Sequence, residues 1–462
     1  MKPLLIVLAL ALVAPLTAPA AQEKPNLVIF LVDDLGWGDL GCYGAIFHET
    51  PNIDSLAGSG MRFTQAYAAC TVCSPSRAAI LTGRYPARLH LTDWIAGHQR
   101  KNPKLQIPEW TMKIGHSLTT LPEALKEEGY RSRFIGKWHL MPIGQGDFDQ
   151  HYPENHGFDT NVGGREWGQP KGPGKYFSPL GMPNLEDGDE GDFLTDKLTD
   201  SAIQFIDESE DDPFLLYFSY YTVHTPVMAK PELVAKYKTK ARSFENTRDE
   251  STHPAYAGMV ESLDDSVGRV LAKLDEAGLA DNTVVIFTAD NGGNSPQSSG
   301  GLRGFKGLAY EGGTREPLIV RWPGAVAPAS VCDVPVIGTD IFPTLLEMAD
   351  APPRPDAHVD GLSLVPLLTG QANSLDRDAL FWHYPHYHRT TPYGAIRQDD
   401  WKLIEFFEDG ALELYDLKSD PSESENLAAS SPQKATDLLA RMRAWRESVG
   451  AQMPTPNPEH TP

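Results

Sequence analysis

The chain has 462 residues, of which 41 % are apolar and 9 % are aromatic, and both values are ordinary for a globular protein. Acidic residues outnumber basic residues by 62 to 40, and the resulting net charge of −22 argues against nucleic acid and anionic membrane surfaces as general partners. A small anionic substrate is not excluded, because a few nearby cations can outweigh a distant field. At this length we expect one large domain and a smaller one.

Residues 1–21 have the pattern of a secretory signal peptide, with Lys2, an apolar run over residues 4–13 and a small-residue ending at Ala20 and Ala21. The apolar run is too short to cross a bilayer, and no later segment is apolar enough to do so. We therefore predict an exported protein, periplasmic or secreted, without a membrane span. Four cysteines, at positions 42, 70, 73 and 332, are too few for a disulfide scaffold.

Continuous apolar runs recur along the chain and are typical of strands that are buried on both faces of a sheet. They are NLVIFLV (26–32), PFLLYFSYY (213–221), TVVIFTA (283–289) and PLIVRW (317–322). Helical patterns lie between them, at 120–129 (with Thr120 and Glu123 at capping-box spacing), at 255–279 and at 340–349. This alternation predicts an α/β fold with a large, mainly parallel sheet sandwiched by helices.

The pattern changes after about Gly370. Short aromatic segments broken by turn residues predict a small antiparallel sheet, and a helix is expected from about Pro432 to Val449. The proline-rich end after Met453 is expected to be disordered. We therefore divide the mature chain into a large α/β domain at 22–372 and a small C-terminal α+β subdomain, with its tail, at 373–462.

Polar side chains follow three of the apolar runs. Asp33 and Asp34 follow the first run, Asp290 and Asn291 follow the run at 283–289, and His224 comes shortly after the run at 213–221. In an open parallel sheet, ligands bind beyond the carboxyl ends of the strands. Three crowded carboxylates and an amide oxygen predict a site for a hard divalent cation, and a flexible oxygen cage suits calcium better than magnesium.

Cationic residues lie in two further motifs. Lys137 and His139, in GKWHL, share one face if the segment is extended, and Arg303 and Lys306 lie in a glycine-rich loop. Taken singly, each has an ordinary explanation as a solvated lysine or a structural histidine. Together with an anionic metal cage, they suit a site that binds a tetrahedral oxyanion.

Cys70 and Cys73 stand three residues apart at the start of a predicted helix. A redox pair would need a much smaller fold, a cysteine-phosphatase loop would need five residues between cysteine and Arg77, and zinc would need two more soft ligands nearby. A disulfide between the two is possible but strained, and pairing of Cys70 with Cys42 or Cys332 is a further alternative. Pro75 suits the first turn of a helix, which places residue 73 at its electropositive N-terminus.

Cys73, Pro75 and Arg77 form the pattern Cys-x-Pro-x-Arg, which LTGR follows at 81–84. Together with DDLGWGDLGCYG, GKWHL, VHTP, TADNGG and the C-terminal WKLI and ELYDL segments, this pattern resembles type I sulfatases, including bacterial polysaccharide sulfatases and arylsulfatases. The resemblance implies an alkaline-phosphatase-like fold and hydrolysis of sulfate esters by the domain at 22–372. It also implies that residue 73 is oxidised to formylglycine by a separate formylglycine-generating enzyme, and that one Ca²⁺ is bound per chain.

The resemblance assigns roles one position at a time. The implied metal ligands are Asp33, Asp34, Asp290, Asn291 and residue 73 itself. Formylglycine hydrate at residue 73 would attack sulfur, Arg77 and Lys137 would stabilise the transferring group, and His224 with Lys306 would bind sulfate and protonate the leaving oxygen. His139 would then take the proton from the second hydroxyl as sulfate leaves.

The substrate is expected to be a sulfated saccharide, with a galactose-type 4-sulfate as the first candidate. The LTDWIAGH and FWHYPHYH stretches look like those of bacterial polysaccharide sulfatases. The candidates in them for contacting the sugar are Trp94, His98, His383, His386 and His388, and Arg303 of the glycine-rich loop is a further candidate. An alternative is that FWHYPHYH is only an aromatic edge of the small sheet.

Two other functions remain open from the sequence. One is a phosphatase or phosphodiesterase of the alkaline-phosphatase-like fold, although such enzymes usually carry serine or threonine as nucleophile and ligands for two zinc ions. The other is a non-catalytic glycan-binding relative, whose hallmark would be the loss of one or more site residues.

Overall fold

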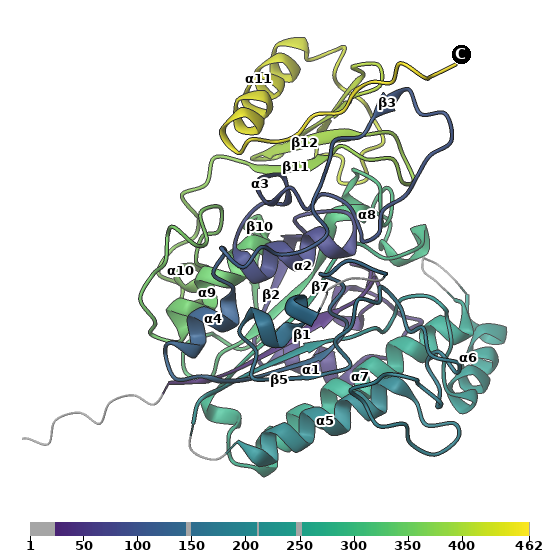
Figure 1. The fold of residues 1–462 in the computed structure, drawn as a ribbon, viewed down its shortest axis with the longest axis vertical. Helices are drawn as coiled ribbons and strands as arrows, with labels where there is room; N and C mark the ends of the chain where they lie inside the picture. The colour runs from purple at the N-terminus through teal and green to yellow at the C-terminus, as the bar shows by residue number, and fades with distance from the viewer. Residues whose placement is uncertain (1–23, 145–148, 210–211, 246–251, 462) are drawn as a thin grey trace, which may run out of the picture.

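The computed structural model describes residues 24–144, 149–209, 212–245 and 252–461. The predicted signal peptide at 1–21 lies outside these ranges. Figure 1 shows a central sheet with helices on both faces and a smaller unit, at the top of the view, that contains α11 and the last strands. Within the described ranges, no helix combines the length and the hydropathy needed to cross a bilayer.

In the part of the chain that the structure describes, the central sheet has nine strands, and all but one of them run in the same direction. In spatial order they are β10 (Val336–Ile337), β2 (Met61–Tyr67), β8 (Arg315–Arg321), β7 (Thr283–Ala289), β1 (Asn26–Val32), β6 (Phe214–Ser219), β4 (Arg131–Gly136) and β5 (Thr160–Val162), with β9 (Ser330–Cys332) also paired to β2. Strand β8, which contains most of the predicted PLIVRW run, is antiparallel to both of its neighbours. The predicted mainly parallel sheet is therefore confirmed.

Strand β1 lies in the middle of the sheet, and its side chains enter two different cores. Val28, Phe30 and Val32 pack in the core that includes α5 and α7, whereas Leu27, Ile29 and Leu31 pack in the core that includes α4 and α9. Successive strand residues point to opposite faces, so a strand covered on both sides has to be apolar at every position. This arrangement explains the unbroken run NLVIFLV.

The helices form layers on the two faces of the central sheet. The first layer contains α1 (Pro51–Gly58), α5 (Leu194–Glu208), α6 (Pro231–Ser243) and α7 (Pro254–Glu276). The second contains α2 (Cys73–Thr82), α4 (Leu121–Lys126), α9 (Ile341–Met348) and α10 (Val365–Leu368), and the short helices α3 (Pro86–Leu89) and α8 (Glu311–Thr314) lie near the small subdomain. At the start of α4, the Thr120 N–H donates to the Glu123 carboxylate at 2.7 Å, as the capping-box spacing predicts.

The small subdomain is an antiparallel sheet of four strands, in the order β11 (Leu380–Tyr384), β12 (Tyr393–Gln398), β13 (Trp401–Phe406) and β14 (Leu412–Asp416). One face packs on α11 (Pro432–Ser448), with Ile396 and Leu403 against Leu438 and Met442. The other face shares a core with the large domain. The small subdomain is thus built onto the large one through buried apolar contacts.

The end of the chain corrects the prediction of a disordered tail. Strand β15 (Thr455–Pro456) pairs with β3 (Leu105–Gln106), and the Asn457 N–H donates to the Lys104 carbonyl at 2.9 Å. These partners lie about 350 residues earlier in the chain. Composition alone describes local preference, so it could not reveal a pairing over this separation.

A buried ionic cluster also joins the two units. The Lys402 ammonium group, on β13, lies 2.9 Å from the Glu311 carboxylate of α8 and 3.0 Å from the Glu423 carboxylate, and the three side chains are fully buried. The Glu423 carboxylate also accepts a hydrogen bond from the Glu311 N–H at 2.6 Å. One cation thus holds together two carboxylates, one of which belongs to the large domain.

We predict that Lys402→Met destabilises the protein by about 3–5 kcal/mol, because the change removes the cation that Glu423 and Glu311 share. Among the described residues, it leaves Glu311 with only the more distant Arg315 as an ion-pair partner, at 3.6 Å. Thermal and denaturant unfolding of the full chain would measure the loss. Lys418→Met, at an exposed position of the same subdomain, is the matched control and should leave stability within about 0.5 kcal/mol of wild type. Equal stability of the two variants would show that this cluster does not hold the units together.

Candidate active site

The carboxylates that follow β1 and β7 meet at one edge of the central sheet. The two strands are parallel neighbours with Val32 opposite Ala289, so the residues after each strand emerge side by side. The Asp34 N–H donates to the Asp290 carboxylate at 3.2 Å, and the Asn291 amide donates to the Asp34 carboxylate at 2.8 Å. All four side chains, including that of Asp33, are fully buried.

Two cations from other elements neutralise Asp33 and Asp290. The Lys137 ammonium group lies 2.7 and 2.8 Å from the two carboxylate oxygens of Asp33. The Arg77 guanidinium donates through Nε to Asp290 at 2.8 Å, and through Nη1 to the Lys137 carbonyl at 2.8 Å. Burial opposes the charge of Arg77, but Asp290 and Asp33 outweigh it and raise the pKa of the guanidinium.

A third cation, Lys306, neutralises Asp34. Its ammonium group lies 2.5 Å from the Asp34 carboxylate. Burial opposes the ionisation of Asp34, but Lys306 and then His224 outweigh it and lower the pKa of this carboxyl group. Burial likewise opposes the charge of Lys306, and Asp34 together with Cys73 raises its pKa. The pair is therefore ionised.

The loop that carries Lys306 depends on a glycine. Gly307 has φ +84°, a conformation that side chains rarely adopt, and a Cβ atom there would lie 2.4 Å from Nδ1 of His388. The Gly307 N–H donates to the Thr71 carbonyl at 2.9 Å, and the Lys306 N–H donates to the Gly293 carbonyl at 2.9 Å. These bonds fix the loop between the approach to Cys73 and the segment after β7.

The carboxylate cluster has the features expected of a cation site. Asp34 Oδ2 and Asn291 Oδ1 are buried, and neither oxygen has a hydrogen-bond partner among the described residues. Burial, together with repulsion from Asp290 and Asp34, raises the pKa of Asp33 to about 8 despite Lys137. An oxygen-rich donor set with unused lone pairs and mutual repulsion fits a hard divalent cation. Ligand atoms of Asp33, Asp34, Cys73 and His224 also lie within 4.8 Å of one another.

Cys73 is the first residue of α2, where the backbone N–H groups of the first turn are directed toward it. All ten residues of this helix are buried, and Cys73 itself is 2 % exposed. The Lys306 ammonium group lies 3.2 Å from its sulfur. Burial raises the pKa of the Cys73 thiol, although Lys137 and Lys306 oppose this effect.

The four cysteines at 42, 70, 73 and 332 are all free thiols, so none of the disulfides considered from the sequence is formed. Cys70 is buried beside the start of α2, and its N–H donates to Ser76 Oγ at 3.0 Å. The contact supports the turn that leads into the helix. It gives Cys70 a packing position rather than a place in the cavity described below.

The two predicted histidines are held in defined tautomers by backbone carbonyl groups. His139 Nε2 lies 2.5 Å from the Ile95 carbonyl and must carry a proton, which leaves Nδ1 buried and without a hydrogen-bond partner among the described residues. His224 Nδ1 lies 2.8 Å from the Thr225 carbonyl, which leaves Nε2 directed toward Asp34 at 3.6 Å. Burial lowers the pKa of His224 to about 3 and lowers that of His139 well below its usual value.

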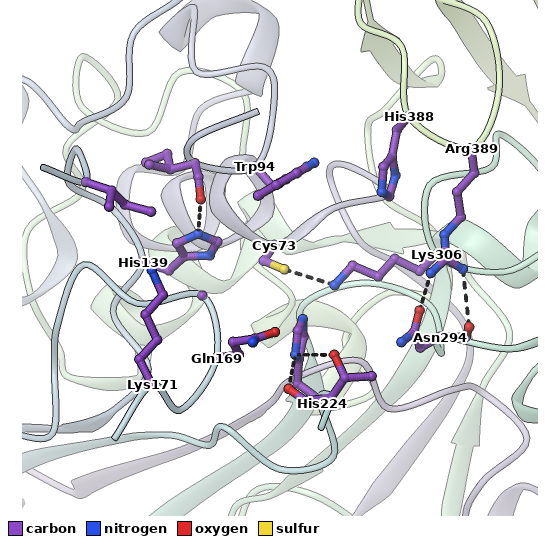
Figure 2. Close-up of a pocket in the computed structure, with 14 residues that line it drawn as sticks. Cys73, Trp94, His139, Gln169, Lys171, His224, Asn294, Lys306, His388 and Arg389 are labelled. Carbon is purple, nitrogen blue, oxygen red and sulfur yellow. Dashed lines mark hydrogen bonds between the residues drawn. The ribbon is translucent and has the colours of Figure 1, made fainter. Parts of the chain in front are cut away.

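A cavity of about 310 Å³ opens over Cys73. Figure 2 shows the side chains of Cys73 and Lys306 directed toward each other, with Trp94 and His388 on one side and His224 on the other. Its walls are formed by Cys73, Trp94, Ile95, His139, Ile143, Gly168, Gln169, Lys171, His224, Thr225, Asn294, Lys306, His388 and Arg389. The structure therefore brings the predicted nucleophile position, three predicted catalytic side chains and two predicted sugar contacts into one cavity.

Four of the predicted sugar contacts lie elsewhere. His386 is fully buried with Nε2 2.7 Å from Thr92 Oγ1, and His383 Nε2 lies 2.8 Å from the Gln452 carbonyl. Arg303 stacks on Tyr310 at 3.8 Å and donates to the Tyr415 hydroxyl. The ring of His98 lies 6.4 Å from that of His388 and is not among the described residues that line the cavity.

The physical reason for these corrections is packing between the two units. Alternation along β11 places His383 on the face opposite Trp382 and Tyr384, which enter the core shared with the large domain. The FWHYPHYH segment is therefore largely buried. Only its end, at His388, reaches the cavity.

Sequence reasoning missed several residues of the cavity wall. Arg389 is the clearest case, since its guanidinium donates to the Asn294 carbonyl at 3.2 Å and lies over the Phe305 ring at 4.8 Å. Gln169 and Lys171 come from a loop rich in glycine and proline. The one feature of the sequence that could have identified Arg389 as a cavity residue is its position directly after His388.

Two family models match the chain. The model described as Sulfatase matches residues 25–351, and the model described as N-sulphoglucosamine sulphohydrolase, C-terminal, matches residues 304–448. The first covers the central sheet and every residue of the carboxylate cluster. The second covers the small subdomain together with the loop of Lys306.

Curated relatives cover most of the chain. A protein named Sulfatase from Formosa agariphila is 33 % identical, over 95 % of this chain and 93 % of its own. N-acetylgalactosamine-6-sulfatase from Rattus norvegicus is 35 % identical, over 79 % of this chain and 70 % of its own.

Solved structures agree with this comparison. The crystal structure of Ps i-CgsB in complex with k-i-k-neocarrahexaose has a TM-score of 0.75 at 29 % identity, covering 92 % of this chain and 93 % of that one. The phosphonate monoester hydrolase of Agrobacterium radiobacter, at 20 % identity and a TM-score of 0.66, shows the fold alone. The predicted alkaline-phosphatase-like architecture with its small C-terminal sheet is confirmed.

Proposed function

Because this chain belongs to the sulfatase family, whose members hydrolyse sulfate esters, we propose that it is an exported enzyme that removes sulfate from a saccharide through formylglycine at residue 73. One observation carries this proposal. The Cys73 sulfur lies at the N-terminus of α2, 3.2 Å from the Lys306 ammonium group and within 4.8 Å of ligand atoms of Asp33, Asp34 and His224. An unmodified thiol is a poor partner for a hard cation, whereas an oxygen-bearing side chain is a good one.

Formylglycine at residue 73 would supply an aldehyde hydrate, with one hydroxyl to attack sulfur and a second to expel sulfate. Because Cys73 is 2 % exposed in the first turn of a fully buried helix, a modifying enzyme could not reach it in the folded protein. The proposed formylglycine-generating partner therefore acts on residues 70–77 before the chain has folded.

The proposed cation is calcium, held by Asp33, Asp34, Asp290 and Asn291 together with residue 73. It would supply Lewis acidity beside the reacting group and balance the carboxylates. Asp34 has φ +59°, a conformation unusual for a residue other than glycine, and this aims its carboxylate into the cluster. The unused oxygens Asp34 Oδ2 and Asn291 Oδ1 support this assignment.

Of the three cations around the carboxylate cluster, Lys306 is the one placed to bind the sulfate group directly. Lys306 reaches the cavity directly, whereas Lys137 and Arg77 lie behind residue 73 and hold Asp33 and Asp290 in place. Because these charges are fixed before substrate arrives, they stabilise the negative charge that develops in the transition state without reorganisation. Arg77 lies on α2, Lys137 follows β4 and Lys306 follows β7, so these charges come together only when the whole large domain has folded.

The two histidines are placed for opposite proton transfers. A bound sulfate ester would bring negative charge next to His224 and raise its pKa, so that Nε2 could carry the proton that the leaving sugar oxygen requires. His139 stays neutral because of burial and the nearby Lys137, so its Nδ1, which has no hydrogen-bond partner among the described residues, can accept a proton from the nucleophile residue. Their tautomers, fixed by the Thr225 and Ile95 carbonyl groups, suit these roles.

The cavity wall supports a sulfated saccharide as the substrate. Trp94 offers an aromatic face for a sugar ring, His388 offers a ring nitrogen for a hydroxyl group, and Arg389 and Lys171 add positive charge at the wall. A galactose-type sugar with a 4-sulfate is the proposed substrate; the relative named N-acetylgalactosamine-6-sulfatase supports a galactose-type sugar, although its name gives the 6-position. Residues 1–21 support export to the periplasm or beyond.

We expect the enzyme to hydrolyse an aryl sulfate at least about 100-fold faster, in kcat/KM, than the matching aryl phosphate. The reason is that, among the described residues, the cavity over residue 73 has one group of metal-ligating side chains, whereas two-metal phosphate-transferring enzymes use a second metal ion beside the reacting group. Parallel assays of the two esters, followed by galactose-type oligosaccharides sulfated at the 4- or the 6-position, would measure this selectivity. A preference for the phosphate ester would overturn the proposed function, and a preference for the 6-sulfate would change only the position.

We also expect Asp290→Asn to lower kcat at least about 100-fold, because the cluster loses one of its three charges. Calcium added to chelator-treated wild type should restore activity and raise the melting temperature, and the variant should lose the thermal shift. Asp275→Asn, at an exposed position on α7, is the matched control and should behave as wild type. A chelator-resistant wild type without a calcium-dependent thermal shift would contradict the cation assignment.

A further inference from the structure

Three histidines gather in a second cluster, away from the cavity over Cys73. His116 lies in the loop before α4, His151 ends the short helix η2 (Asp149–His151), and His156 ends the short helix η3 (Pro153–His156). The ring centroid of His116 is 4.9 Å from each of the others, and the remaining two centroids are 5.9 Å apart. One ring nitrogen from each residue lies within 4.8 Å of the other two.

His156 is the residue that calls for an explanation. It is 1 % exposed, and neither of its ring nitrogens has a hydrogen-bond partner among the described residues. Buried polar atoms are nearly always satisfied, because an unsatisfied one loses its hydration without compensation. A bound metal ion would satisfy one of these nitrogens.

The backbone around the cluster is firmly held. The His156 carbonyl accepts a hydrogen bond from Thr120 Oγ1 at 2.7 Å, and the His151 carbonyl accepts one from Trp138 Nε1 at 2.8 Å. The three rings are close to parallel, with interplanar angles between 9° and 21°. The exposed His116, in contrast, is free of packing on its solvent side and can adjust to a ligand.

The buried ring of His156 is a neutral imidazole. Burial, and then the nearby rings of His116 and His151, lower the pKa of His156 to about 3. A neutral imidazole has a lone pair available for a metal, and three imidazoles without a carboxylate suit zinc and its neighbours rather than calcium or magnesium.

We propose that His116, His151 and His156 form a binding site for a divalent transition-metal ion, with Zn²⁺ as the reference ion and a fourth position open to solvent beside His116. Zinc–nitrogen bonds of about 2.0–2.1 Å require ring nitrogens roughly 3.3 Å apart in a tetrahedral site. The nitrogens now lie within 4.8 Å of one another, so each pair has to approach by at most about 1.5 Å to reach this spacing, and the exposed His116 ring is the one with most freedom to move.

The site would act on the stability of the catalytic segment. Trp138, whose indole contacts the His156 ring at 5.7 Å between centroids, stands between Lys137 and His139 in the chain. Metal binding to the cluster would therefore stabilise the contact between His156 and Trp138, and with it the position of the segment from Lys137 to His139. It would not supply a group to the reaction, because none of the three histidines lines the cavity over Cys73 in the described part of the chain.

The test uses the full mature chain with calcium in excess and with Cys73→Ala as background, so that neither the carboxylate cluster nor an unconverted thiol takes up zinc. Zn²⁺ bound per chain is measured by elemental analysis after gel filtration. Co²⁺ is the optical probe, because nitrogen ligation in a four-coordinate site gives visible absorption bands. We expect one Zn²⁺ per chain, a melting temperature that rises with zinc concentration, and visible Co²⁺ bands.

In the same background, His116→Ala should keep the zinc-free melting temperature, because its side chain is exposed, and should bind zinc at least about 10-fold more weakly. His460→Ala removes a histidine distant in sequence and should bind zinc as the parent does. Equal zinc binding by the parent and His116→Ala, or the absence of binding by the parent, would overturn the proposal and leave the cluster as neutral rings packed on Trp138. Neither outcome bears on the proposed sulfatase activity, because calcium, not zinc, is tested there.

Discussion

The structure depends on bringing three aspartates together in a place without water. The parallel register of β1 and β7 sets Asp33, Asp34 and Asp290 side by side, and all three are fully buried. Such a cluster is unstable unless opposite charge is supplied at short range. Lys137, Arg77 and Lys306 supply it from three separate segments, so the site forms only when the whole large domain has folded.

This requirement explains the position of α2 and of the small subdomain. Helix α2 is buried along its whole length, and its first two turns hold residue 73 against Lys306 and Arg77 against Asp290. The small antiparallel sheet covers the other side of this region and shares a core with it, and the buried Lys402 ties the two units together. The subdomain also adds His388 and Arg389 to the cavity wall.

Much of this arrangement could be predicted from the sequence, because it follows from local rules. An unbroken apolar run such as NLVIFLV indicates a strand buried on two faces, and polar residues directly after such strands must meet at one edge of the sheet. This reasoning predicted the proximity of Asp33, Asp34, Asp290 and Asn291. The Cys-x-Pro-x-Arg pattern predicted the first turn of α2.

Other features depend on contacts between distant segments, and local patterns do not encode them. His383, His386 and Arg303 look like surface groups in an aromatic or glycine-rich stretch, but they are bound by the Gln452 carbonyl, Thr92 and the Tyr415 hydroxyl. The pairing of β15 with β3 and the assembly of the three histidines from a loop and two short helices are of the same kind.

The most direct test of the central claim is the mass of the tryptic peptide that spans residues 63–77, taken from enzyme made in its own host. We expect residue 73 to be an aldehyde, so that the peptide has one alkylatable thiol, at Cys70, instead of two, and we expect the converted fraction to be proportional to turnover of an aryl sulfate. Two alkylatable thiols in fully active enzyme would contradict this expectation.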